Sequence, residues 1–375
     1  MNSFKSFNLY SNTLRALDGM GIAIPTPIQV QAIPPLLQGR DVIAQARTGS
    51  GKTLAFGIPL VEAIDFNCTG VQALVLTPTR ELATQIGEVL TRLGQTARIE
   101  TGLVFGGRSV ASQEKLLKAG VDIVVGAPGR VLDLINRGVL KTDAIRFLVL
   151  DEADEMLDRG FAPDVERILT RLPKKRQTAL FSATVPAWVP QMARRHLIDP
   201  VQVQVDTRPI DRPAIEHVAL TVPESQRFDA LRHLLDTRPG GSALVFGRTK
   251  HGVKKLGRRL ADLGYPVAAL QGNLSQNARD RVMADFRTGK TQIMLATNVA
   301  ARGLDVDSVA LVVNYELPES AELLTHRIGR TGRMGREGRA VTVLTESDIE
   351  RFRQFEKQLG FSIPRSKLQL TPKVA

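Results

Sequence analysis

Residues 147–154 read Phe-Leu-Val-Leu-Asp-Glu-Ala-Asp, and this stretch decides the fold class. Four apolar residues lead directly into three carboxylates within four positions. A short apolar run rich in branched side chains predicts a strand that is buried on both faces of a parallel sheet. Ligands bind beyond the carboxyl ends of such strands, where acidic side chains can hold a metal ion. The stretch therefore predicts an α/β protein with a ligand site at this strand end.

The same succession of a short apolar strand, a turn of small residues and a helix recurs along the chain. We expect strands at 41–45, 73–76, 103–105, 123–125 and 178–181 in the first half, and at 243–246, 267–270, 293–296 and 310–313 in the second. This alternation predicts a doubly wound parallel sheet in each half. Residues 206–213 are polar and contain two prolines, which is typical of a linker. We therefore expect domains at 1–207 and 214–375, with a linker at 208–213.

Composition limits the class of protein further. The chain has 375 residues, of which 43% are hydrophobic, and this is enough for two cores. No apolar run approaches the ~18 residues that cross a bilayer, and the first residues lack the apolar segment of a signal peptide. Cys68 is the only cysteine, which excludes an internal disulfide and a zinc site built on cysteines. We therefore expect a cytoplasmic protein without a membrane partner.

The net charge is +12, and most of it lies in the second half. Residues 1–207 hold 23 Lys and Arg against 20 Asp and Glu, whereas residues 208–375 hold 27 against 18. Such an excess of positive charge is typical of proteins that bind a polyanion, with nucleic acid first. A basic surface that is merely solvated explains it equally well, so charge alone leaves both interpretations open.

Residues 46–53 read Ala-Arg-Thr-Gly-Ser-Gly-Lys-Thr and lie between a predicted strand and a predicted amphipathic helix. This context indicates a phosphate-binding loop. Its glycines let backbone N–H groups turn toward phosphate oxygens, and the helix N-terminus adds partial positive charge. Lys52 can reach the terminal phosphates, and the Thr53 hydroxyl can ligate Mg²⁺. We predict that this loop binds a nucleoside triphosphate, with Ala46 in place of the usual first glycine.

Three further strand ends in the first half suit a phosphate backbone: Pro78-Thr79-Arg80, Gly106-Gly107 and Pro128-Gly129-Arg130. N–H groups, hydroxyls and arginines at successive strand ends favour a groove that follows a nucleic-acid backbone, although each is compatible with an ordinary α/β turn. Gln29 has the donors and the acceptor to read a base edge. Taken alone, it is better explained as an exposed residue at a helix start.

The second half lacks another loop of this type. It contains His326-Arg327-Ile328-Gly329-Arg330-Thr331-Gly332-Arg333, in which three arginines stand three residues apart. We expect a fixed surface to present them, because such an array does not suit a hydrophobic core face. A solvated basic loop would give the same pattern. One nucleotide site and one arginine array in separate domains favour arginine fingers that stabilise a transferring phosphoryl group.

Together these motifs resemble those of the DEAD-box family of ATP-dependent RNA helicases. Nine of them occur in the family's order, at 25–29, 46–53, 78–83, 106–107, 128–130, 151–154, 182–184, 297–305 and 326–333. The details are similar to bacterial members, with the RhlE-type branch as one candidate. The resemblance implies two RecA-like doubly wound domains, ATP and Mg²⁺ as ligands, and RNA bound through its backbone with little sequence specificity.

The resemblance also implies roles for individual residues. The expected ATP contacts are Phe7 and Gln29 at the base, Asp305 at the ribose, and Thr48, Gly49, Ser50, Gly51, Lys52 and Thr53 at the phosphates. The expected metal ligands are Thr53 and Asp151. The expected catalytic residues are Glu152, which would activate the attacking water, together with Asp151, Lys52, Arg330 and Arg333.

Two further groups of residues follow from the same resemblance. Asp154, Ser182 and Thr184 would couple the nucleotide state to closure of the two domains. The expected RNA contacts are Pro78, Thr79, Arg80, Gly107, Gly129, Arg130, Arg248, Arg279 and Thr297. Ala127 stands where a Thr is common in the family, and Asn298 stands where an Asp is common.

The expected activity is RNA-stimulated ATP hydrolysis, coupled to domain closure and to local separation of short RNA duplexes. An ATP-gated RNA clamp or annealing chaperone would use the same residues, so the sequence leaves this alternative open. The motif set argues against a DNA helicase.

Overall fold

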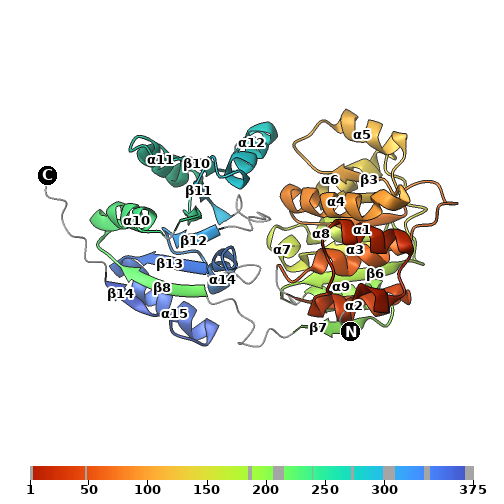
Figure 1. The fold of residues 1–375 in the computed structure, drawn as a ribbon, viewed down its shortest axis with the longest axis horizontal. Helices are drawn as coiled ribbons and strands as arrows, with labels where there is room; N and C mark the ends of the chain where they lie inside the picture. The colour runs from red at the N-terminus through yellow and green to blue at the C-terminus, as the bar shows by residue number, and fades with distance from the viewer. Residues whose placement is uncertain are drawn as a thin grey trace. The chain divides into compact units, whose positions relative to one another are not determined.

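The computed structural model describes residues 3–46, 49–184, 188–205, 215–238, 240–271, 274–298, 309–332 and 338–367. The chain divides into two compact units, residues 1–206 and 207–375 (Figure 1). The expected linker at 208–213 lies outside the described residues. In the described ranges, no helix has the length and apolar character to cross a membrane.

A seven-stranded parallel sheet forms the centre of the first unit, in the order β3-β4-β2-β5-β6-β1-β7. Its strands are β1 (Val42–Gln45), β2 (Ala73–Leu76), β3 (Thr101–Val104), β4 (Ile123–Gly126), β5 (Phe147–Asp151), β6 (Gln177–Ser182) and β7 (Val201–Gln204). All of β5 is buried, with β2 and β6 as its neighbours. The prediction of a buried parallel strand at the head of the acidic stretch is therefore confirmed.

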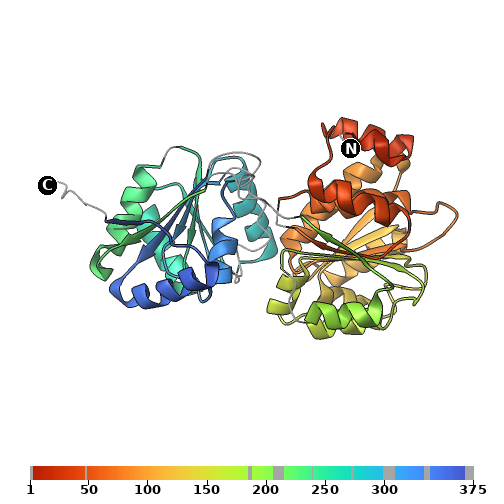
Figure 2. The ribbon, with the colours of Figure 1, turned by 90° about the horizontal axis from the view of Figure 1, so that it is seen from below.

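Alternate side chains of each strand pack on opposite faces of this sheet. Phe147 and Val149 belong to a core shared with α1 to α4, whereas Leu148 and Leu150 belong to a core shared with α6 to α9. The helices are α1 (Ser11–Gly19), α2 (Pro27–Leu37), α3 (Lys52–Glu62), α4 (Arg80–Gly94), α5 (Val110–Ala119), α6 (Pro128–Asn136), α7 (Ala153–Asp158), α8 (Ala162–Leu169) and α9 (Trp188–His196). Figure 2 shows helices on both faces of the sheet, as a doubly wound fold requires.

The second unit repeats this topology strand for strand. Its parallel sheet has the order β10-β11-β9-β12-β13-β8-β14, so that β9 takes the place of β2 and β12 the place of β5. The strands are β8 (Ile215–Thr221), β9 (Ser242–Phe246), β10 (Val267–Leu270), β11 (Ile293–Ala296), β12 (Val309–Asn314), β13 (Gly338–Leu344) and β14 (Arg365–Lys367). The described helices are α10 (Arg227–Asp236), α11 (Lys250–Ala261), α12 (Gln276–Arg287), α14 (Ala321–Ile328) and α15 (Ile349–Leu359).

The predicted fold class is confirmed, and so are all ten predicted strands, with shifts of a residue or two at their ends. The sequence pattern did not find β7, β8, β13 and β14. Three of these strands carry polar or charged residues among apolar ones, as in Val-Gln-Val-Gln of β7 and Ile-Glu-His-Val of β8, and β14 consists of Arg-Ser-Lys alone. A search for uninterrupted apolar runs misses such strands, because sheet pairing tolerates polar side chains on a less buried face.

Candidate nucleotide and nucleic-acid site

The phosphate-binding loop lies between β1 and α3, and its glycines have backbone conformations that other residues avoid. Gly49 and Gly51 have φ angles of +81° and +92°. A Cβ atom on Gly51 would lie 2.6 Å from Gln29 Nε2 and 2.9 Å from Thr26 Oγ1. Position 51 therefore requires glycine both for its conformation and for its space. Thr48, predicted to belong to this loop, lies outside the described residues.

Gln29 is buried rather than exposed, with only 2% of its surface accessible. Its Oε1 accepts a hydrogen bond from the Thr26 N–H at 2.9 Å, and its Nε2 donates to the Gly51 carbonyl at 3.0 Å. These two bonds leave one N–H and one lone pair of the amide for a further partner, which matches the edge of a base. The exposed helix-start interpretation of Gln29 was therefore wrong. Phe7, also buried, lies in the 3₁₀ turn Phe4–Phe7.

The acids at the end of β5 face the lysine of the loop. Lys52 Nζ lies 4.0 Å from Asp151 Oδ1, and both side chains are almost fully buried. Asp151 Oδ1 also accepts the Glu152 N–H at 3.0 Å. Burial raises the pKa of Asp151 to about 6, while the Lys52 ammonium opposes the rise and the Glu152 carboxylate adds to it. A cation at this strand end would relieve the crowding of negative charge.

Three buried polar atoms near this strand end have no hydrogen-bond partner among the described residues. They are Lys52 Nζ, Ser50 Oγ and Glu152 Oε2. Buried polar groups in folded proteins are nearly always paired, so a group of unpaired ones suggests that a ligand completes the site. An ammonium and a hydroxyl suit phosphate oxygens, and a free carboxylate oxygen suits a water molecule. The residues present therefore fit a nucleoside triphosphate with Mg²⁺ near Asp151 and Thr53.

A tight connection follows the acids and joins them to β6. Glu152 adopts a left-handed backbone conformation with φ +52° and ψ +52°, and α7 begins at the next residue. The Asp154 N–H donates to Ser182 Oγ at 3.2 Å. Asp154 Oδ2 accepts from the N–H of Thr184 at 2.9 Å and from its hydroxyl at 3.0 Å. The three residues predicted to couple nucleotide state to closure are thus in direct contact, with Thr184 as the partner of the carboxylate.

The predicted RNA residues of the first unit lie at the ends of β2, β3 and β4. The Thr79 hydroxyl accepts the Leu82 N–H at 3.1 Å and thereby caps α4. The Arg80 guanidinium lies against Gly107, where a Cβ atom would approach Arg80 Nη1 to 2.1 Å. Arg130 Nη1 donates to the Arg108 carbonyl at 3.3 Å. Pro78 is buried beside this group, and Gly129 lies in the first turn of α6.

In the second unit, the predicted RNA residues also follow strand ends. Arg248 lies two residues after the end of β9, and Thr297 comes directly after β11, its paired neighbour. Arg279 lies in the first turn of α12. The backbone N–H of Arg248 donates to Glu316 Oε2 at 2.7 Å. Arg330 lies in the turn after α14. Asp305 and Arg333 lie outside the described residues.

Arg327 corrects the expectation that all three arginines of the array are presented at the surface. Its side chain is 3% exposed, and its guanidinium lies over the Phe246 ring, 4.9 Å from the centroid. It donates to Asn298 Oδ1 at 2.5 Å, to Asn314 Oδ1 at 3.2 Å and to the Glu316 carbonyl at 2.9 Å. Burial lowers the pKa of Arg327 to about 9. Oxygens at the strand ends accept hydrogen bonds from its Nε and Nη1 groups, which offsets much of the cost of burial, whereas Nη2 has no hydrogen-bond partner among the described residues.

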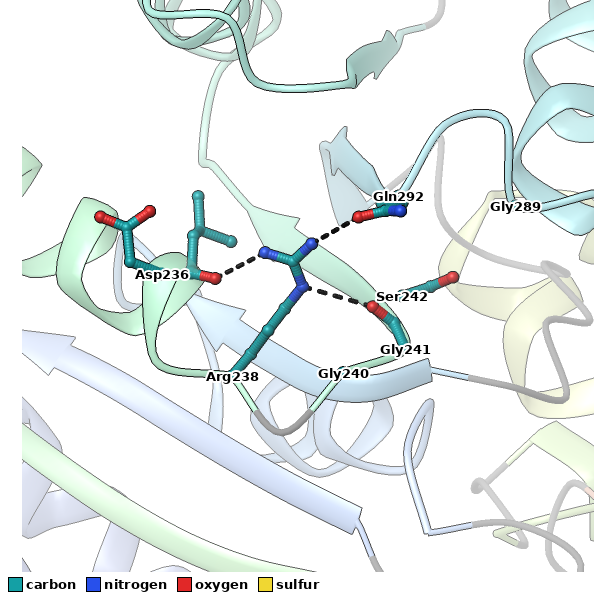
Figure 3. A pocket seen from close by; sticks show the side chains of 8 residues that line it. Asp236, Arg238, Gly240, Gly241, Ser242, Gly289 and Gln292 are labelled. Atoms are coloured by element: carbon teal, nitrogen blue, oxygen red, sulfur yellow. Dashed lines mark hydrogen bonds between the residues drawn. The ribbon is translucent and has the colours of Figure 1, made fainter.

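A cavity of about 430 Å³ opens at the opposite, amino edge of the second unit's sheet (Figure 3). It lies beside the start of β9, and the Arg238 guanidinium crosses it. Arg238 donates to Gln292 Oε1 at 2.7 Å, to the Leu235 carbonyl at 2.5 Å and to the Gly241 carbonyl at 3.3 Å. These bonds hold the turn before β9 in place. The cavity is therefore separate from the predicted nucleotide and RNA residues, which lie at the carboxyl ends of the strands.

Comparison with known proteins assigns the family. A family model described as "DEAD/DEAH box helicase" matches residues 26–192, and one described as "Helicase conserved C-terminal domain" matches residues 226–335. The chain belongs to the DEAD-box helicase family. This DEAD-box protein is 42% identical to the DEAD-box ATP-dependent RNA helicase CshA of Geobacillus kaustophilus, over 98% of this chain and 79% of that relative. It is 41% identical to the ATP-dependent RNA helicase DbpA of Bacillus subtilis, over 100% of this chain and 78% of that one.

Solved structures give the same answer for the fold. This DEAD-box chain is similar to S. cerevisiae Dbp5 bound to RNA and ADP BeF3, with a TM-score of 0.87 and 32% identity, covering 98% of this chain and 96% of that one. The predicted resemblance to bacterial members of the family and the two RecA-like sheets are thereby confirmed.

Proposed function

We propose that this DEAD-box protein hydrolyses ATP in an RNA-stimulated reaction and uses the cycle to separate short RNA duplexes locally. The observation that carries the proposal is the group of buried polar atoms beside β5, in which Lys52 Nζ and Glu152 Oε2 have no hydrogen-bond partner among the described residues. Phosphate oxygens and an attacking water would satisfy them. The names of the relatives, both ATP-dependent RNA helicases, support the same pair of substrates.

In this proposal the first unit holds ATP through its loop. Lys52 and Ser50 bind phosphate oxygens, and Thr53 and Asp151 hold Mg²⁺, which supplies neutralising charge. Glu152 accepts a hydrogen bond from the attacking water and takes its proton, which its unpaired Oε2 suits. Because the side chains are buried, charges fixed in this site act more strongly than they would in water. Arg330 and Arg333 of the second unit supply the remaining positive charge to the transferring phosphoryl group.

We infer that the contacts of Asp154 couple hydrolysis to RNA. Asp154 holds the end of β6 through Ser182 and Thr184, and it lies two residues from Glu152. A shift of the strand end that brings the second unit into place would therefore also move the residues beside Glu152.

The domains in this scheme are residues 1–207 and 214–375, with 208–213 as the linker. ATP and RNA together draw them onto one bent strand. Since each stacked base-pair step contributes ~1–2 kcal/mol in DNA, one such cycle melts only a few pairs.

The proposal is tested by ATPase and unwinding assays on the full chain. Single-stranded RNA should stimulate hydrolysis several-fold or more, single-stranded DNA should have little effect, and Lys52→Gln serves as the inactive control. A short tailed RNA duplex should separate over repeated cycles with ATP, whereas a non-hydrolysable analogue should allow at most one round and leave the protein bound to the RNA. Equal stimulation by DNA would remove the RNA assignment. RNA binding and annealing without any separation would identify an ATP-gated clamp or annealing chaperone instead.

A further inference from the structure

Helix α11 presents a strongly basic face in the second unit. Val253, Leu256 and Leu260 pack it against the sheet, and the opposite side of the helix is exposed. The exposed side carries five cationic residues, and residues 250–261 contain no Asp or Glu. The cationic residues are Lys250, Lys254, Lys255, Arg258 and Arg259. Figure 1 shows α11 beside β10, at one end of the strand order.

Most of these charges are not used inside the protein. Arg259 covers the ring of Phe228, with its guanidinium carbon 3.7 Å from the centroid. Lys250, Lys254, Lys255 and Arg258 form no ion pair with any residue in the described part of the chain. Mutual repulsion of unpaired like charges on one helix is unfavourable, so the fold itself gains nothing from them.

The first unit provides an internal comparison. Helix α4 joins β2 to β3 just as α11 joins β9 to β10, and β2 and β9 hold the same place in the two sheets. Each helix begins after a threonine whose hydroxyl caps it, Thr79 or Thr249. Yet α4 contains two Arg and two Glu. The same architectural position is therefore electrically neutral in one unit and carries five positive charges in the other.

The position of α11 connects this charge with the proposed RNA path. Arg248, a predicted RNA contact, stands two residues before the first residue of α11. The helix starts at the carboxyl edge of the sheet and leads away from it over ~18 Å, given its twelve residues. Lys250, Lys254 and Arg258 recur once per turn along it. An RNA molecule that extends beyond the nucleotides bound at this carboxyl edge of the sheet would therefore meet a row of cations.

We propose that the basic face of α11 binds the phosphate backbone of duplex RNA that flanks the strand held at the carboxyl edge of the second unit. The inference rests on the proposed function. A duplex fits this surface better than a single strand does, because a double helix presents roughly one charge per 1.7 Å of its axis and a single strand about half of that. A duplex beside a helix of ~18 Å thus offers on the order of ten phosphates in a rigid array. Contact with them releases counterions, which makes binding sensitive to salt.

The test compares two triple variants that remove the same charge. The first is Lys250→Gln, Lys254→Gln and Arg258→Gln. The control is Arg287→Gln, Arg353→Gln and Lys357→Gln, which lie exposed on α12 and α15 and form no ion pair in the described part of the chain. Affinity is measured with a non-hydrolysable ATP analogue over a salt series. The ligands are a single strand and the same strand with a duplex flank.

The α11 variant should bind the flanked RNA at least about tenfold more weakly, and the slope of log Kd against log salt should fall by about 2 to 3. Its affinity for the single strand, and its ATPase stimulation by that strand, should stay within about twofold of the wild type, which also shows that it is folded. Unchanged affinity for the flanked RNA, or an equal loss in the control, would overturn the inference. Failure of the proposed function is distinct, because the wild type itself would then show no RNA-stimulated hydrolysis.

Discussion

Replacing Gly107 with alanine should weaken RNA binding by about tenfold or more while ATP binding persists. The new Cβ atom would lie 2.1 Å from Arg80 Nη1 and 2.8 Å from the guanidinium carbon. Optimal separations of non-bonded heavy atoms are ~3.5–4.0 Å, so the guanidinium must move away by more than about 1 Å. Since a hydrogen bond that involves a charged group contributes ~1.5–3 kcal/mol, displacing Arg80 from a phosphate corresponds to roughly 10- to 100-fold in affinity.

The substitution should leave the protein folded. Gly107 has a φ of +86°, a region that costs a residue with a side chain ~1–2 kcal/mol. This is small beside the ~5–15 kcal/mol by which native proteins are stable. Gly106→Ala is the matched control, because a Cβ atom there would lie 3.5 Å from Arg80 Nη2, an ordinary contact.

The assay is fluorescence anisotropy with a labelled single-stranded RNA and a non-hydrolysable ATP analogue, together with the RNA concentration that half-saturates the ATPase. Both quantities should shift in Gly107→Ala and stay near the wild-type values in Gly106→Ala. The reasoning is refuted if Gly107→Ala binds RNA as the wild type does, or if the two variants lose the same affinity.

Other predictions concern catalysis, helix capping and pH. Glu152→Gln should lower hydrolysis at least ~100-fold, as loss of a general base does, while equilibrium binding of ATP and RNA persists; normal turnover would exclude this role. Ala127 is the N-cap of α6 with extended backbone and no side-chain cap bond, so Ala127→Thr should raise the free energy of unfolding by ~1 kcal/mol in denaturant titrations. Burial lowers the pKa of His217 to about 4 from 6.5. The neutral imidazole therefore contributes stability above pH 6.5 that is lost as pH falls toward 4, by ~2 kcal/mol between pH 7 and pH 5. The loss is measured by amide hydrogen exchange in residues 338–344, which form the strand paired with the strand of His217. Exchange there should become faster at pH 5 in the wild type, after correction for the intrinsic pH dependence of exchange. An equal loss of stability in His217→Gln would contradict the assignment to this imidazole.

Local pattern was enough to predict the strands that end in functional residues. The run before Asp151 and the glycines around Lys52 are signals contained within a few residues, and both lie where they were expected. The strands missed are those that contain polar or charged residues, so the local pattern does not mark them. For example, β8 contains Glu216 and His217 and is held between β13 and β14, more than a hundred residues later.

Contacts between distant residues could not be predicted from spacing. The amide of Gln29 contacts the loop at Gly51, 22 positions away, and only the folded chain shows that this glutamine is buried. Arg327 was misjudged for the same reason. Its Nε and Nη1 groups donate to Asn298 and Asn314, which lie at or just after the ends of two other strands, and no rule based on neighbouring residues reveals such partners.

The left-handed backbone at Glu152 has a consequence for how this protein responds to selection. Glycine adopts that conformation without the ~1–2 kcal/mol that a side chain costs there, and it would also remove the unpaired carboxylate oxygen. A library screened for thermal tolerance alone should therefore enrich Glu152→Gly, a variant without the proposed base. If Glu152 is the base proposed above, heat resistance and turnover oppose each other at this one residue, and a screen intended to improve the enzyme has to select for both at once.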